Sequence, residues 1–302
     1  MEWIILALLS PAAYAVVNFV DKYIVSGGVA DSSGMPFYSA IVAVFFGTVY
    51  WSVFHPPIHS SRLVGMVLLA GILTNLSTAL YFRVISREAA SRIIIWLQLV
   101  PALVLPMSTF FLREAITLIQ IYGFVTVLFA AICLNLSLTS EGISLKLSRA
   151  SLGQILLADC LLAVSMVLLK AATESAVYPA VIVLESWGIG LGAVVLCLIY
   201  PTGLKVFMAG LRNAGKRDLS LIFINETGLL AGKLIGILAL TMGPVSLVSV
   251  LGSTQVFFGL VLGNLTPLLK PDIFQEDASQ LSRLRDFAMA FLMFFGVWMI
   301  YV

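Results

Sequence analysis

The sequence predicts an all-α polytopic membrane protein, with ten transmembrane helices arranged as two inverted five-helix repeats. Hydrophobic residues make up 61% of the 302 residues and charged residues 11%, whereas soluble domains contain about 45–50% and about 25% of these classes. The apolar residues form ten runs, each close to the roughly 20 residues that a spanning helix needs. Turn-forming segments separate the runs, and no soluble domain fits between them.

The first five spans are predicted in order along residues 1–138. The run that begins at Trp3 lacks a basic leading region and a cleavage motif, so we predict a spanning helix and not a removable signal peptide. Gly- and Pro-containing turns at 26–36 and 55–61 end the first two spans, and a charged hairpin at 86–92 precedes the fourth. The predicted spans are 3–24, 36–54, 63–84, 92–111 and 116–138.

The second five spans are predicted along residues 151–302, after a basic cytoplasmic linker at 139–150. A basic loop at 201–218 separates the seventh and eighth spans, and a charged insertion at 271–284 precedes the last one. Because five is odd, the second half has to be inverted relative to the first half, residues 1–138. The predicted spans are 151–172, 179–201, 219–240, 244–264 and 285–302.

The placement of Lys and Arg predicts the orientation. Thirteen of the 17 lie in loops on the side reached after the first span, three lie on the other side, and Lys233 lies inside a span. Cytoplasmic loops carry the excess of Lys and Arg. We therefore expect a multi-pass protein of the plasma (inner) membrane with both termini non-cytoplasmic.

Residues 79–134 resemble the end of a repeat of the EamA-type transporters, in the drug/metabolite transporter superfamily. The matching residues are Tyr81, Ala89, Ala90, Pro101, Glu114 and Gly123. The resemblance implies ten helices as two inverted repeats, a central cavity lined mainly by helices 1, 3, 4, 6, 8 and 9, and secondary transport of a small polar metabolite without ATP. The second half departs from the family pattern, with Val256 in place of the usual proline and Leu269 in place of the usual glutamate.

Four ionisable residues lie well inside predicted spans: Asp159, Glu185, Glu226 and Lys233. A charge at mid-membrane costs about 2.5–3.5 kcal/mol, so such residues usually face a cavity and pair. Their depths predict that Lys233 pairs with Glu185 in the outer half. Asp159 and Glu226 are predicted to form a carboxylate pair nearer the cytoplasm, with one of them holding a proton. This pair would couple transport to protons or bind a cationic amine; the alternative is that all four residues only hold helices together or face a wet vestibule.

The eighth span is predicted to have two different faces. Glu226 and Lys233 are seven residues apart, so they share one face and lie about 10 Å apart along the axis. Gly228, Gly232 and Gly236 fall on roughly the opposite face. Small residues at four-residue spacing let helices pack closely in lipid, so we expect a packing face and a polar face.

Six further polar or aromatic residues are candidates for contact with a substrate. They lie within the first, third and fourth spans: Tyr14, Asn18, Asn75, Tyr81, Trp96 and Gln98. The alternative is that they bond between helices, which is worth about 0.6 kcal/mol on average, or that Trp96 serves only in packing. No metal site is predicted, because the prolines between His55 and His59 oppose a helix there.

Taken together, these residues predict a secondary transporter that moves an amino acid, an amine or a similar small polar metabolite by alternating access. We expect no enzymatic activity, no cofactor and no nucleic-acid partner; the partners are a small-molecule substrate and membrane lipid. The sequence does not indicate the oligomeric state. Two alternatives stay open: a flippase or translocase for a lipid-linked substrate, with a lateral portal, and a membrane scaffold with no cavity.

Overall fold

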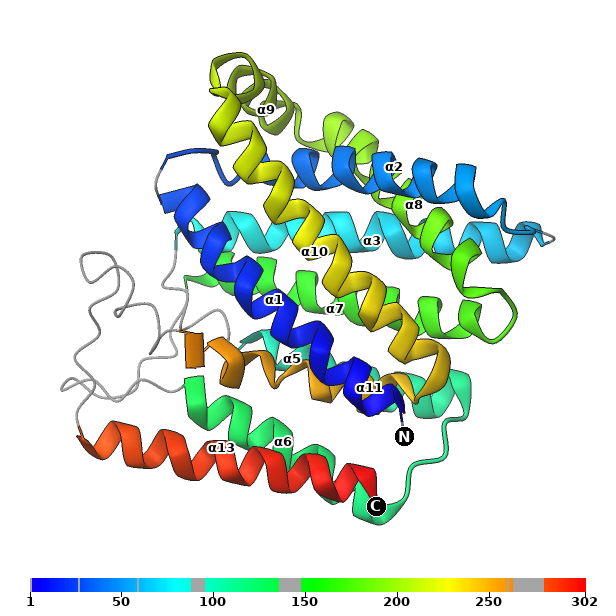
Figure 1. Ribbon diagram of the computed structural model, residues 1–302, viewed down its shortest axis with the longest axis vertical. Coiled ribbons are helices and arrows are strands. Elements are labelled where there is room, and N and C mark those ends of the chain that lie inside the picture. Colours follow the sequence, from blue (N-terminus) through cyan, green and yellow to red (C-terminus); the bar gives the residue numbers. More distant parts are fainter. Residues whose placement is uncertain are drawn as a thin grey trace.

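The computed structural model describes residues 2–26, 28–58, 60–87, 96–135, 148–259, 261–262 and 280–302. Every regular element in these ranges is a helix (Figure 1). The elements are α1 (Glu2–Ser26), α2 (Met35–Phe54), α3 (Ser61–Ile85), α5 (Leu99–Met107), the π-helix η1 (Ser108–Leu112), α6 (Leu118–Asn135), α7 (Arg149–Thr173), α8 (Tyr178–Ile199), α9 (Pro201–Asn213), α10 (Lys216–Met242), α11 (Val245–Gly252) and α13 (Gln280–Tyr301).

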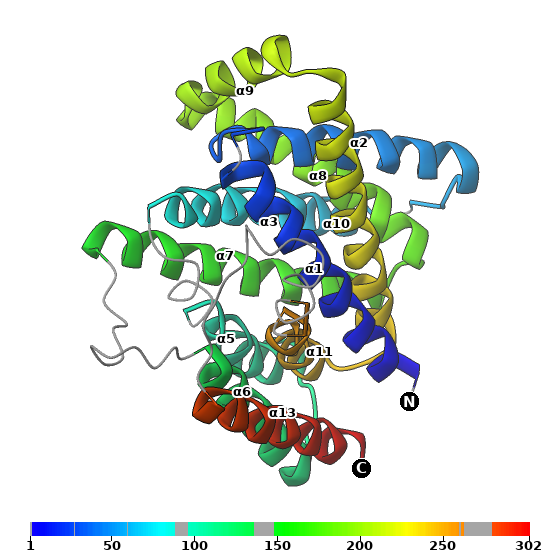
Figure 2. The same cartoon turned by 60° about the vertical axis from the view of Figure 1, so that its left-hand side comes forward.

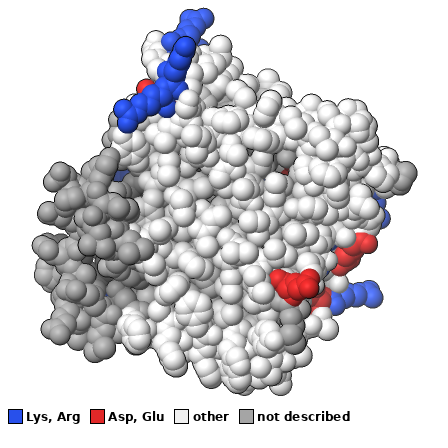
Figure 3. Space-filling model, viewed as in Figure 1, with Lys and Arg blue, Asp and Glu red and all other residues white. Residues whose placement is uncertain are grey.

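The helices confirm the predicted fold class. Six of the described helices (α1, α2, α3, α7, α8 and α10) are long and apolar enough to cross a membrane. Four shorter apolar helices fall at Leu99–Leu112, Leu118–Leu134, Val245–Gly259 and Phe287–Tyr301. Charged side chains lie near the edges of the face in Figure 3, and the broad middle is uncharged. Many large apolar side chains of the described helices are exposed, as a lipid-facing surface requires.

The bundle is held together by five close helix pairs from distant parts of the chain. These pairs are α1 with α10, α3 with α7, α3 with α8, α2 with α8, and α6 with α13. In both Figure 1 and Figure 2, α3 lies between α2 and α7, and α6 and α13 lie together at the lower edge. Both chain ends lie at the same end of the bundle (Figure 1).

Glycines permit the closest of these contacts. On α8, a Cβ at Gly188 would lie 3.0 Å from the Cα of Gly71 on α3, so the two backbones touch. The glycine face predicted for α10 is confirmed, because it packs against α1. The Ser10 hydroxyl on α1 donates a hydrogen bond of 2.8 Å to the Gly232 carbonyl oxygen, and a Cβ at Gly228 would lie 3.3 Å from the Val17 side chain.

The prediction of a loop over residues 201–218 was wrong, because Pro201–Asn213 forms the helix α9. Its apolar residues are too few for a span but lie on one side. Phe207 is buried against the rings of Phe37 and Tyr38 of α2, at centroid distances of 5.6 and 4.8 Å. This aromatic contact fixes α9 against the end of the bundle, with Lys205 and Arg212 exposed.

The helix α11 begins after Pro244, and its start is held by Glu114 from the connection between η1 and α6. Glu114 Oε1 accepts a hydrogen bond of 2.7 Å from the Val245 backbone N–H. Glu114 Oε2 accepts one of 2.9 Å from the Ser246 hydroxyl. A carboxylate at a helix N-terminus satisfies unpaired N–H groups and complements the helix dipole.

Several predicted features lie wholly or partly outside the described residues. The start of the fourth span, most of the linker at 139–150, and the insertion at 271–284 up to residue 279 are among them; the last residues of the insertion belong to α13. The same holds for His59, Ala89, Ala90 and Leu269. The helix that contains the last predicted span begins at Gln280, and its apolar part, Phe287–Tyr301, agrees with the predicted 285–302.

Candidate functional site

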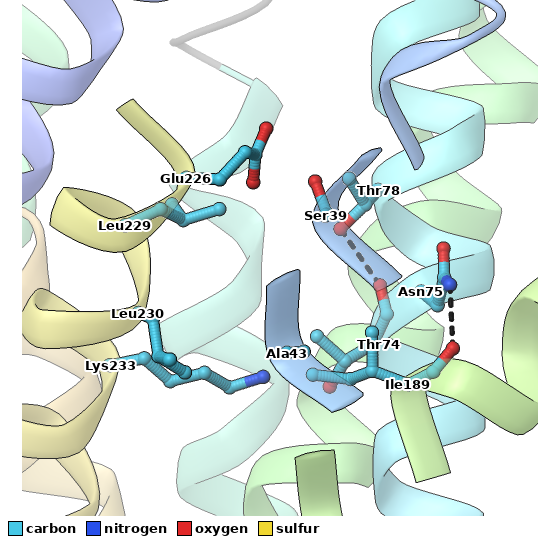
Figure 4. A pocket seen from close by; sticks show the side chains of 10 residues that line it. All are labelled: Ser39, Ala43, Thr74, Asn75, Thr78, Ile189, Glu226, Leu229, Leu230 and Lys233. Carbon is cyan, nitrogen blue, oxygen red and sulfur yellow. Dashed lines mark hydrogen bonds between the residues drawn. The ribbon is translucent and has the colours of Figure 1, made fainter. Parts of the chain in front are cut away.

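A cavity lined by both polar and apolar side chains opens between α2, α3, α8 and α10. The space between its walls measures about 430 Å³, open solvent at its mouth included. It is lined by Ser39, Ala43, Thr74, Asn75, Thr78, Ile189, Glu226, Leu229, Leu230 and Lys233. In Figure 4, Glu226 and Lys233 extend from α10 toward the side chains of α2 and α3.

The two faces of α10 explain why the cavity is there. The glycine face packs on α1, so the face with Glu226 and Lys233 turns toward α2, α3 and α8. The glycine contact draws α3 and α8 together, whereas α10 and α2 meet less closely. The cavity therefore lies beside the looser contact between α10 and α2, because small residues draw other helix pairs together.

The predicted pairing of Lys233 with Glu185 is confirmed. Lys233 Nζ lies 2.8 Å from Glu185 Oε1, and the two side chains are 17% and 2% exposed. Glu185 Oε1 is buried and accepts no aligned hydrogen bond, so the contact is held by charge. Glu185 lies on α8 about one turn before Gly188, and the close α3–α8 contact places it beside the cavity.

Glu226 lies nearer the other end of the cavity and is 3% exposed. The Ser39 hydroxyl of α2 faces its carboxylate (Figure 4). The second carboxylate in its electrostatic surroundings belongs to Asp21 of α1. The Asn225 amide donates a hydrogen bond of 2.6 Å to Asp21 Oδ1, so α1 and α10 join in a polar cluster at this end.

The predicted pair of Asp159 and Glu226 was wrong. Asp159 lies on α7, is fully buried, and neither of its carboxylate oxygens accepts a hydrogen bond from the described residues. The reason is the packing order, because α7 contacts the side of α3 away from α2 (Figure 1, Figure 2). Depth in the membrane is similar for Asp159 and Glu226, but depth does not say which helices are neighbours.

Two of the six further candidates for contact with a substrate lie at or beside the cavity. Asn75 is 2% exposed and lines it; its Nδ2 donates a hydrogen bond of 2.7 Å to the Ile189 carbonyl oxygen, while Oδ1 is buried without a partner. Tyr14 packs on Gly232, and its ring would lie 3.1 Å from a Cβ there. Tyr14 is also in the electrostatic range of Glu185, although it is not one of the lining residues.

The remaining four candidates for substrate contact do not line this cavity, and their contact with a substrate stays a prediction. Asn18 is exposed on α1, Tyr81 lies near Asp21, and Trp96 packs in an apolar cluster of the ends of α3 and α7. Gln98 is buried at the start of α5. Periodicity placed these residues on polar stripes, but it did not reveal which stripe faces the opening.

The lining also differs from the cavity that the family resemblance implied. Of the implied helices, the third and eighth spans (α3 and α10) contribute lining residues to this cavity. The other lining residues come from the second and seventh spans (α2 and α8), which the resemblance did not imply. Sequence reasoning missed Ser39 and Thr74, because hydroxyl groups within apolar spans usually bond to their own helix, and both do so here.

Carboxyl groups outnumber cations around the cavity. The ionisable groups in or near the cavity are the carboxyl groups of Glu226, its neighbour Asp21 and Glu185, and the ammonium group of Lys233, which pairs with Glu185. When all are ionised, the site has a net charge of −2, and the single Lys is already paired. No group of three or more metal-ligating residues occurs among the described residues.

Comparison with known proteins agrees with this architecture. Residues 1–136 match the model of the EamA-like transporter family, which confirms the resemblance seen in residues 79–134. No curated protein matches the chain. One crystal structure of 13% sequence identity aligns with 100% of this chain and 99% of its own, with a TM-score of 0.66, and so shares the fold. The match of residues 1–136 to this family implies a membrane transporter of small molecules.

Proposed function

With residues 1–136 matching the EamA-like transporter family, we propose that the protein is a secondary transporter that carries a small amine-bearing metabolite, such as an amino acid or an amine, by alternating access. One observation carries the proposal: a cavity between helices of both halves is lined by Glu226 and by Lys233, the partner of Glu185. Ionisable residues inside a membrane protein usually mark the path of a substrate or ion. The proposal needs no catalytic residue and no cofactor.

The helix pairs support two repeats at 1–138 and 151–302. Each helix of the first repeat has a counterpart in the second repeat, in chain order: α1 and α7, α2 and α8, α3 and α10, α5 and α11, and α6 and α13. When each helix is replaced by its counterpart, the contact α1–α10 becomes the observed contact α7–α3, and α5–α7 becomes the observed contact α11–α1. The pairs α2–α8, α6–α13 and α5–α11 map onto themselves. The exchange departs from symmetry where α3–α8 is close and α10–α2 is loose. Rocking of one repeat against the other would open and close that looser contact.

The electrostatics of the cavity support a substrate with an amino group. The ammonium group would bind at Glu226, which lacks a Lys or Arg partner among the described residues. Lys233 could receive a substrate carboxylate if it leaves Glu185. A phosphate ester or nucleotide sugar would need more cations than Lys233 supplies, since phosphate groups are bound by clusters of Arg and Lys.

The presence of the cavity speaks against a membrane scaffold, for which we expected none. A carrier of lipid-linked substrates would require an opening toward lipid. We propose the transporter for water-soluble metabolites, and the binding experiment below separates the two.

The test is a thermal-shift measurement on the purified protein at two pH values with putrescine, alanine, uridine and glucose. A ligand present at 100 times its dissociation constant stabilises the folded state by about 2.7 kcal/mol. We expect stabilisation by an amine-bearing probe, its loss in Glu226→Gln, and its retention in the surface variant Asp218→Asn. Stabilisation by uridine or glucose alone would overturn the assignment of an amine-bearing substrate, and stabilisation by none of the four would favour the lipid-linked alternative.

We further propose that the protein lies in the plasma (inner) membrane with both termini outside the cytoplasm. The basic residues exposed on α9 and at the start of α10 (Lys205, Arg212, Lys216 and Arg217) lie on the side that the Lys and Arg bias assigns to the cytoplasm. Alkaline phosphatase fused after Val302 should be active. A cytoplasmic, inactive fusion would invert the orientation.

A further inference from the structure

A second ionisable site lies outside the cavity, on α7. Asp159 is fully buried, and both carboxylate oxygens lack a hydrogen-bond partner among the described residues. One turn earlier on the same side of α7, Ile155 packs with Val84 and Trp96 in an apolar cluster. An ionised carboxylate in such surroundings is among the costliest groups that a fold can bury, and a buried charge without a partner takes up a proton or a counter-ion.

No described cation is placed to be that counter-ion. Six elements pack against α7, and three of them, α5, η1 and α11, contain no Asp, Glu, Lys, Arg or His. On α7 itself, Arg149 and Lys170 are each at least ten residues away, or about 15 Å along the helix. The Lys170 ammonium group donates to carbonyl oxygens at the end of α10.

The charged groups of the other three elements are engaged elsewhere. On α3, the Arg83 guanidinium lies 3.8 Å from the centroid of the Tyr200 ring. Arg62 is at the opposite end of α3, and Tyr81 has Asp21 as its charged neighbour. The Glu185 carboxylate of α8 pairs with Lys233 of α10. Of the other titratable groups on these elements, Glu226 lines the cavity and the Tyr178 hydroxyl donates to the Leu234 carbonyl oxygen. Lys216, Arg217 and Asp218 lie at the start of α10, Cys197 packs in a separate apolar cluster, and Cys160 on α7 is exposed.

Hydroxyl groups connect α7 to the wall of the cavity through α3. The Ser77 hydroxyl donates a hydrogen bond of 2.8 Å to the carbonyl oxygen of Ala158, the residue before Asp159. The hydroxyl groups of Thr74 and Ser165 lie 2.8 Å apart, and Thr74 also lines the cavity. A movement of α7 relative to α3 would therefore change the surroundings of both the Asp159 carboxyl group and the wall of the cavity.

We propose that Asp159 is a proton-binding site, separate from the substrate cavity and on the other side of α3, that couples a proton to the transport cycle. The carboxyl group holds its proton in the packing seen here. It releases the proton when the α3–α7 contact opens to water, and takes up another before the contact closes. This inference rests on the proposed function for its role in transport, but the bound proton can be tested without any substrate.

The first experiment is infrared spectroscopy of the purified protein at neutral pH, which detects the carbonyl stretch of a protonated carboxyl group. We expect the aspartic-acid band in the wild type and in Asp218→Asn, and its loss in Asp159→Asn. If the variant does not fold, wild-type protein labelled with carbon-13 aspartate shows whether an aspartic acid carries the band, and Asp21→Asn, which should keep the band, shows that this acid is not Asp21. Absence of any labelled band would overturn the proposal.

Two experiments distinguish a proton that only stabilises the fold from a proton that is coupled to transport: hydrogen exchange in D₂O, and a transport assay in vesicles. In D₂O the band should shift, because a coupling site reaches water during the cycle; a band that never shifts would overturn the coupling role. In vesicles that contain a pH dye, putrescine should dissipate an imposed pH gradient with wild type and not with Asp159→Asn, while the variant keeps its thermal stabilisation by putrescine. If no probe binds, the proposed function fails, and the exchange experiment still decides the proton site.

Discussion

Removal of the Lys233 ammonium group should destabilise the protein far more than removal of its partner. In Lys233→Met, the Glu185 carboxylate, which is 2% exposed, would stay buried without a cation. Breaking a buried pair in this way costs about 3–5 kcal/mol, because the remaining charge is uncompensated. In Glu185→Gln the remaining Lys233 side chain is 17% exposed, so its charge can reach the solvent of the cavity and the cost should be smaller.

The double variant Glu185→Gln/Lys233→Met then becomes the decisive sample. With both charges gone, its free energy of unfolding should return to within about 1–2 kcal/mol of wild type, because replacement of a whole buried pair by neutral groups is often nearly neutral. The assay is thermal or denaturant unfolding of the four proteins in the same detergent, combined as a double-mutant cycle. Additive effects in the double variant would refute the ion pair, and so would a Lys233→Met effect no larger than that of Glu185→Gln.

Three further changes test the packing. Gly188→Val should prevent stable folding, since a Cβ would lie 2.5 Å from the Leu68 carbonyl oxygen, while Gly65→Ala, where a Cβ meets nothing within 4 Å, should be neutral in the yield of folded protein. Glu114→Ala should cost about 1–2 kcal/mol through loss of the cap on α11; an unchanged unfolding midpoint would contradict that role. Phe207→Ala should cost about 3–5 kcal/mol as a buried aromatic is lost, measured by unfolding, unless α9 is held by something other than its ring contacts.

The spans were predictable because hydropathy acts along the chain. A run such as 149–173 is apolar over most of its length, and lipid leaves it no stable alternative to a helix. The same local reasoning failed over 201–213, where a short run with basic residues is compatible with either a loop or a surface helix. The contact of Phe207 with the start of α2 stabilises the helix over the loop, and that contact joins segments more than 160 residues apart.

The candidate site was only partly predictable for a related reason. Residues seven apart on one helix share a face, so the polar face of Glu226 and Lys233 and the glycine face behind it follow from helix geometry. Lys233 and Glu185 also meet as their depths predict. Depth is one coordinate, however, and it could not distinguish Asp21 from Asp159 as the second carboxylate near Glu226.

By itself, the sequence determined that the protein is an all-helical membrane protein and where its apolar helices lie along the chain. It also determined that a few charged side chains had to be sheltered from lipid. The tertiary structure decided which helices are neighbours. Close approach at Gly71 and Gly188 joins α3 to α8, and the glycines of α10 join it to α1. The polar face of α10 is thereby left on a cavity, and Asp159 lies alone across α3. The physical reason is that packing depends on the shapes of two surfaces at once, whereas hydropathy is a property of one segment.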